Sequence, residues 1–156
     1  LKDVLKEAVV MTEQGEILTL PVEKLDMGYR TSRIKKAGYL VLEARLVLEQ
    51  GDMDKIRDIT KDLTEKRVSK QPLEYPSAGS TFKRPEGYFA GKLIMDAGLR
   101  GYQVGDAQVS EKHCGFVINR GEATAADVAD LIRKVQEQVY EKFQVKLEPE
   151  VRMLGF

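Results

Sequence analysis

The stretch YPSAGSTFKRPEGYFAGK, residues 75–92, decides how the rest of the chain is interpreted. It places proline and glycine around Ser77 and Ser80, and it runs into a small-residue helix start at Ala90. Glycine beside serine lets the backbone approach a ligand closely, and Lys83 and Arg84 supply positive charge for a phosphate or a carboxylate. From these residues alone, an anion-binding loop and an ordinary turn-rich connection with a solvated basic pair both stay open.

The composition limits the size, the partners and the compartment. The 156 residues suffice for one domain with a real core or for two small lobes. Basic and acidic residues number 25 each, so the net charge is zero and we expect no nucleic acid partner. One cysteine, Cys114, and one histidine, His113, exclude an internal disulfide and the usual structural zinc sites, so we expect no metal and a cytoplasmic location. No apolar run approaches the roughly 20 residues of a membrane span, so we expect no membrane partner.

The first part of the sequence predicts β-structure. Residues on both sides of Glu13–Gly15 alternate in polarity, which indicates a hairpin over residues 8–22. Residues 39–48 favour a long strand that pairs with the hairpin. The segment 24–38 between them is rich in glycine and basic residues and predicts an exposed loop.

A helix should follow this β-structure. Asp52 is placed as an N-cap for an amphipathic helix that extends to about Val68. Its apolar stripe, which we expect in the core, comprises Met53, Ile56, Ile59 and Leu63.

The second part mixes helices and short strands. A lobe boundary is expected at residues 69–76, a short helix at 90–97, and a long helix that starts at Thr124 with a capping box to Asp127 and ends at Phe143. The expected strands cover residues 80–83, 101–110, 115–119 and 145–154. This order predicts an α+β fold rather than a regular βαβ array.

Four separated pieces of sequence now coincide in order: GYRTS at 28–32, PSAGSTFKRPEG at 76–87, AGKLIMDAGLRGYQVGDAQVSEKHCGFVIN at 90–119 and EPEVRMLG at 148–155. Together they closely resemble the C-terminal part of the UDP-N-acetylenolpyruvoylglucosamine reductases, flavoenzymes of bacterial peptidoglycan precursor synthesis, in the shorter of the family's two types. The resemblance covers nearly the whole chain and is strongest from Gln71 onward. A chance match of four spaced pieces is improbable where one alone would be weak.

The resemblance implies a fold with three parts. Residues 1–69 would be the later part of an FAD-binding α+β domain, with a β-hairpin, a long strand and a helix. Residues 70–146 would be a small α+β substrate-binding domain with a long C-terminal helix. Residues 147–156 would form a strand that returns to the flavin domain.

The family's reaction, as the resemblance implies it, reduces FAD with NADPH and then transfers a hydride to the enolpyruvyl group of UDP-N-acetylglucosamine enolpyruvate. The product is UDP-N-acetylmuramate. By match to the motifs, Ser80 would donate the proton that completes the reduction, while Glu150 and Arg30 would polarise and hold the enolpyruvyl carboxylate.

The same match suggests residues for binding. Tyr29 and Arg152 would lie at the flavin, and the candidates for the substrate or its diphosphate are Lys70, Lys83, Arg84 and His113. Taken singly, each of these residues is more typical of a surface pair or a turn, and only their coincidence in one family pattern favours function. Cys114 precedes an apolar strand, and we interpret it as a core residue rather than a nucleophile.

The chain starts at Leu1 inside what resembles a secondary-structure element, so we expect a fragment that lacks the N-terminal flavin-binding part. Such a fragment should be inactive alone and should self-associate through the exposed sheet edges of its first half. Two alternatives stay open: a stand-alone UDP-sugar-binding module of the same fold without redox activity, and an interaction domain that keeps only the scaffold.

Overall fold

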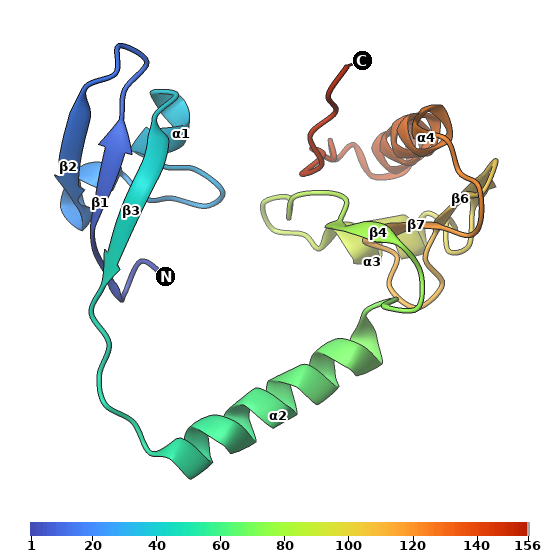
Figure 1. Cartoon of the computed structure of the whole chain (residues 1–156). Helices are drawn as coiled ribbons and strands as arrows, with labels where there is room; N and C mark the ends of the chain where they lie inside the picture. The colour runs from blue at the N-terminus through green and yellow to red at the C-terminus, as the bar shows by residue number, and fades with distance from the viewer. Residues whose placement is uncertain (156) are drawn as a thin grey trace. The chain divides into compact units, whose positions relative to one another are not determined.

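The computed structural model describes residues 1–155 and divides into two compact units, one from Leu1 to Ile56 and one from Arg57 onward (Figure 1). Both units mix helices with antiparallel strands, which confirms the predicted α+β class. The expected domain boundaries near residues 70 and 147 stay predictions.

The first unit is an antiparallel sheet in the order β2-β1-β3, formed by β1 (Leu5–Met11), β2 (Ile17–Pro21) and β3 (Leu40–Leu46). The β1–β2 turn closes through a hydrogen bond of 2.9 Å from Thr12 N to Glu16 O. Gly15 has φ +84°, which glycine adopts without a Cβ penalty. The predicted hairpin and its pairing with the long strand are therefore confirmed.

The segment predicted as an exposed loop is more ordered than expected. A 3-10 helix, η1 (Val22–Leu25), extends into its start, and the segment contains a short helix, α1 (Arg33–Lys36), whose N-cap Ser32 accepts a hydrogen bond from Lys35 N. Leu25 is only 1% exposed and packs with Ala8, Val10 and Leu20 of the sheet. A single buried leucine thus anchors a segment that the charged residues around it made look fully solvated.

Helix α2 (Met53–Lys70) forms where the sequence predicts it, but its apolar stripe does not lie in the core. None of the described residues of α2 is buried, and the stripe residues Met53, Ile56, Ile59 and Leu63 are 54–72% exposed. The expectation of a core stripe was wrong because periodicity identifies the apolar face of a helix and not a surface that covers it. No helix within residues 1–155 is long and apolar enough to cross a membrane.

The second unit is built on an antiparallel sheet in the order β4-β7-β6-β5. Its strands are β4 (Ser77–Ser80), β5 (Gln103–Val104), β6 (Ala107–Val109) and β7 (Phe116–Asn119). Helix α4 (Ala125–Phe143) lies across this sheet (Figure 1), and α3 (Ala90–Asp96) contacts α4.

Helix α4 confirms its prediction in detail. Thr124 accepts a hydrogen bond from Asp127 N, and the Asp127 carboxylate accepts one from Thr124 N, so the capping box is complete. The face that meets the sheet is buried and comprises Leu131, Ile132, Val135 and Val139. Cys114 joins the same core at 6% exposure, as expected.

The expected strands 101–110 and 145–154 are both broken. The first is a small hairpin of β5 and β6 that turns at Gly105, where φ is +53°. The second is reduced to one bridge between Pro149 and Phe82, because proline has no N–H with which to continue a ladder. The bridge pairs the C-terminal segment with the second unit, and its expected return to the first unit stays a prediction.

Candidate functional site

The serine proposed as proton donor, Ser80, ends β4 at an exposed position. Gly79 before it has φ +85°, and a Cβ there would meet nothing within 4 Å, so the glycine is required by backbone conformation rather than by space. On the other side of Ser80, Thr81 is 3% exposed. Its N–H donates to Gly115 O at 2.8 Å, and its hydroxyl accepts from Val117 N at 2.9 Å. Ser80 therefore lies between Gly79, which has a left-handed backbone, and Thr81, which is buried and hydrogen-bonded to β7 and the turn before it.

The C-terminal segment brings the backbone of Glu150 beside the residue that follows β4. The backbone N–H of Glu150 donates to Thr81 O at 2.9 Å, and the N–H of Lys83 donates to Glu148 O at 2.8 Å. These bonds flank the bridge between Phe82 and Pro149. Glu150 is therefore fixed beside the residue that directly follows Ser80.

The basic pair after this strand is engaged with neighbouring side chains. The Lys83 ammonium forms an ion pair with the Glu148 carboxylate. The Arg84 guanidinium lies 4.0 Å from the centre of the Phe89 ring, and its Nε donates to Tyr88 O at 3.3 Å. Both aromatic rings are about half exposed, so the loop presents a cationic and aromatic surface.

His113 and Lys70 lie at different places in the second unit. The His113 Nδ1 accepts a hydrogen bond from Gly115 N at 3.1 Å, and its ring meets Phe116 edge-on with the centroids 5.0 Å apart. His113 therefore shapes the turn that leads into β7, next to β4. Lys70 is the exposed last residue of α2.

Tyr29 and Arg30 lie in the first unit, on a turn closed by two hydrogen bonds between Gly28 and Thr31. Arg30 has φ +55°, which is uncommon for a residue with a side chain. Its guanidinium lies 5.4 Å from the centre of the Tyr29 ring. Strained backbone of this kind concentrates at functional sites, which supports a role for the turn. The expected role of Arg30 at the enolpyruvyl carboxylate stays a prediction.

A cavity of about 360 Å³ borders the strand that carries Ser80. It is largely apolar, with Ser77 and Thr81 of the β4 segment on one side and Ile132 of α4 and Val151 on another.

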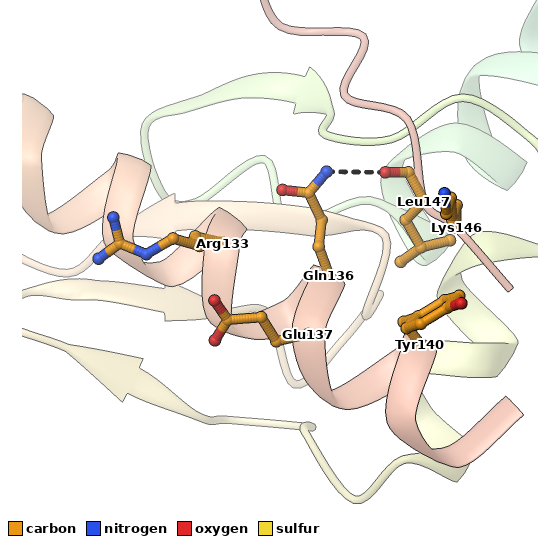
Figure 2. Close-up of a pocket in the computed structure, with 6 residues that line it drawn as sticks. All are labelled: Arg133, Gln136, Glu137, Tyr140, Lys146 and Leu147. Atoms are coloured by element: carbon orange, nitrogen blue, oxygen red, sulfur yellow. Dashed lines mark hydrogen bonds between the residues drawn. The ribbon is translucent and has the colours of Figure 1, made fainter. Parts of the chain in front are cut away.

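A second cavity, of about 380 Å³, lies between α4 and the C-terminal segment (Figure 2). It contains none of the expected site residues, and Gln136 Nε2 there donates to Leu147 O at 2.8 Å. This bond helps to anchor the segment that leads to Glu150.

The cysteine next to His113 is not an activated nucleophile. Burial raises the pKa of the Cys114 thiol, because a charged thiolate is disfavoured away from water. The interpretation of Cys114 as a core residue agrees with this direction.

Two residues of the site were missed from the sequence. Thr81 joins Ser80 to Glu150 through its carbonyl, and Glu148 pairs with Lys83. Glu148 lies 65 positions from Lys83, and nothing in the local sequence signals that pairing. Thr81 was recognisable only as a β-favouring residue after a serine.

The second unit thus belongs to the class of small α+β domains in which one antiparallel sheet, covered by a long helix, carries a serine and a carboxylate on adjacent segments. A family model of the UDP-N-acetylenolpyruvoylglucosamine reductase C-terminal domain matches residues 71–154. The chain belongs to this family, which confirms the resemblance found in its motifs.

Relatives that match nearly the whole chain carry the same family name. The UDP-N-acetylenolpyruvoylglucosamine reductase of Agathobacter rectalis is 64% identical over 99% of this chain and 49% of its own length. That of Lachnoclostridium phytofermentans is 61% identical over 99% of this chain and 50% of its own length. The crystal structure of the UDP-N-acetylenolpyruvylglucosamine reductase of Thermus caldophilus superimposes with a TM-score of 0.81 at 34% sequence identity. The match covers 97% of this chain and 53% of the Thermus chain. The chain spans about half the length of the curated relatives it matches.

Proposed function

We propose that this chain supplies the substrate-protonating part of a cytoplasmic UDP-N-acetylenolpyruvoylglucosamine reductase. The whole protein would reduce UDP-N-acetylglucosamine enolpyruvate to UDP-N-acetylmuramate for peptidoglycan synthesis, with NADPH as the reductant and FAD as the hydride carrier. The names of the relatives support the reaction. The observation that carries the residue roles is the hydrogen bond from Glu150 N to Thr81 O, because it holds the backbone of the residue with the proposed carboxyl beside the residue that follows the proposed proton donor.

The described residues do not by themselves fit FAD. A dinucleotide needs an extended cleft, and neither of the two cavities described above is lined by Tyr29 or Arg152. No step at the flavin is therefore assigned to this chain, and we expect the chain alone to be inactive.

The substrate chemistry needs a proton and a stabilised negative charge. Addition of a hydride to the vinyl β-carbon moves the π-electron pair toward the carboxyl-bearing side and leaves an enolate. Ser80 Oγ–H would give its proton to the α-carbon, since an enolate held close and dry is a strong enough base. Glu150 and Arg30 would polarise and hold the carboxylate on which the charge develops.

Further residues would hold the rest of the substrate. Lys70, Arg84 and His113 are candidates for the diphosphate, and Lys83 was expected to join them. Arg84 is already held over the Phe89 ring, which orients its fork of N–H donors for an oxygen anion. The exposed Tyr88 and Phe89 rings beside it are suitable contacts for a nucleoside.

The test is Ser80→Ala in a protein of the relatives' full length that ends in this chain, with Ser69→Ala on the exposed surface of α2 as the control. Ser80→Ala should leave flavin reduction by NADPH unchanged and should slow flavin reoxidation by the substrate by about 10²–10⁴-fold. Ser69→Ala should change neither rate. Reoxidation that is barely slower in Ser80→Ala would refute the role of Ser80. Substrate binding without any reoxidation in the wild type would instead favour a UDP-sugar-binding module without redox activity.

A further inference from the structure

The C-terminal segment is attached to the serine strand by a compact set of interactions at residues 148–150. Two backbone hydrogen bonds of 2.8 and 2.9 Å join it to Lys83 and Thr81. Between them Phe82, at 5% exposure, faces Pro149 in the bridge. Lys83 and Glu148 add an ion pair to the first of these backbone bonds, so the same two residues are joined twice.

The ion pair is unequal in its surroundings. The Lys83 side chain is 24% exposed, whereas the Glu148 side chain is 70% exposed. A partly desolvated ammonium gains more from a fixed carboxylate than an exposed one does. Exposed pairs contribute little to global stability, so the consequence of this pair is local and concerns the register of the segment.

Register matters here because Glu150 carries the proposed carboxyl. Leu147, at 3% exposure, anchors the segment before the bridge and the half-buried Val151 packs against the core after it, whereas residues 152–155 are all exposed. Pro149 offers no N–H, so the ladder has no further bond at that position. The bonds at Thr81 and Lys83 therefore hold the backbone of residues 148–150 in register with the serine strand.

We propose that the ion pair between Lys83 and Glu148 is a positioning latch that keeps Glu150 beside Ser80, and that Lys83 does not bind the substrate diphosphate. The inference rests on the proposed function, because the position of Glu150 matters only if its carboxyl acts on the substrate. Lys83 and Glu148 act through Glu150 and do not touch the reacting atoms. Their loss misplaces the carboxyl by a fraction of a side-chain length, and displacements of about 1 Å at a reacting group cost on the order of 10²-fold in rate.

The test uses Lys83→Met, Glu148→Gln and the charge swap Lys83→Glu with Glu148→Lys, in a protein of the relatives' full length that ends in this chain. Lys92→Met is the matched control, because Lys92 pairs with Asp96 on the surface of α3 at 2.7 Å. Each single latch variant should slow flavin reoxidation by the substrate about 10–100-fold. The substrate Kd should change by less than about threefold, and the swap should recover most of the rate. The control should match the wild type.

A different pattern would overturn the latch. If Lys83→Met weakens substrate binding about tenfold or more while Glu148→Gln has no effect, Lys83 binds the substrate directly. Failure of the swap to recover the rate would also contradict positioning. Amide exchange supplies an independent readout: the Glu150 N–H should exchange faster in Glu148→Gln, and Glu148 is exposed enough for this variant to fold. If the wild type does not turn over, the proposed function fails, and unchanged exchange at Glu150 would refute the latch separately.

Discussion

The turn at Gly105 couples the β5–β6 hairpin to the cap of α4. Gly105 has φ +53°, and a Cβ there would lie 2.6 Å from the carboxyl carbon of Asp127. That carboxylate accepts from Thr124 N at 2.9 Å and from the Thr124 hydroxyl at 2.8 Å. Gly105→Ala should therefore add backbone strain and also displace the capping box.

The two costs can be estimated separately. A left-handed conformation costs a residue with a Cβ about 1–2 kcal/mol, and loss of an N-cap costs about 1 kcal/mol. Gly105→Ala should thus cost about 2–3 kcal/mol, which corresponds to a fall of about 10–20 °C in the Tm of the second unit. Gly98→Ala is the control, because Gly98 has φ +84° with nothing within 4 Å of its Cβ position, so it should show the strain alone.

Thermal unfolding followed by circular dichroism measures both variants. In an Asp127→Ala background, the additional effect of Gly105→Ala should fall to that of Gly98→Ala, because the carboxylate it clashes with is gone. If Gly105→Ala costs no more than Gly98→Ala in the wild type, the predicted coupling between the hairpin and the helix cap is wrong.

Three further predictions concern pH, the thiol and association. Hydrogen bonds from the backbone and side chain of Thr124 lower the pKa of the Asp127 carboxyl in the folded chain. The ionised Asp127 therefore stabilises the fold fully above its unfolded-state pKa, and this stabilisation is lost as the pH falls through its folded-state pKa. Asp127→Asn should flatten the dependence of the Tm on pH below about pH 4. Cys114, whose pKa is raised by burial, should resist a thiol reagent at pH 8 until urea unfolds the chain, and equal labelling of folded chain would contradict this. Every residue of β3 is exposed and the strand lies at a sheet edge, so light scattering should give a mass above that of the monomer, and Leu42→Lys should reduce it; a monomeric wild type would refute this association.

The sequence predicted best what is decided locally. The period of α4, its capping box at Thr124 and Asp127, and the glycine turn of the first hairpin all depend on residues within a few positions of one another. The exposed stripe of α2 had the same kind of signal, yet burial requires a second surface that periodicity does not specify. Local patterns therefore predicted elements and not their environment.

The site shows the same division. Ser80 and Glu150 could be named from family motifs, and the structure joins their segments through Thr81. The pairing of Lys83 with Glu148 could not be predicted, because two charged residues far apart in sequence carry no signal of register. The role of Lys83 as a substrate ligand, expected from the motif, stays a prediction beside this pairing.

The central claim is that this chain carries the substrate side of the reaction and not a complete flavin site. Titration of the purified chain with UDP-N-acetylglucosamine enolpyruvate, and separately with FAD, tests it most directly through thermal shift and flavin absorbance. The account predicts that the UDP-sugar raises the Tm, as any ligand of the folded state does, and that FAD keeps the spectrum of the free cofactor. Tight FAD binding, or no response to the UDP-sugar at millimolar concentration, would contradict it.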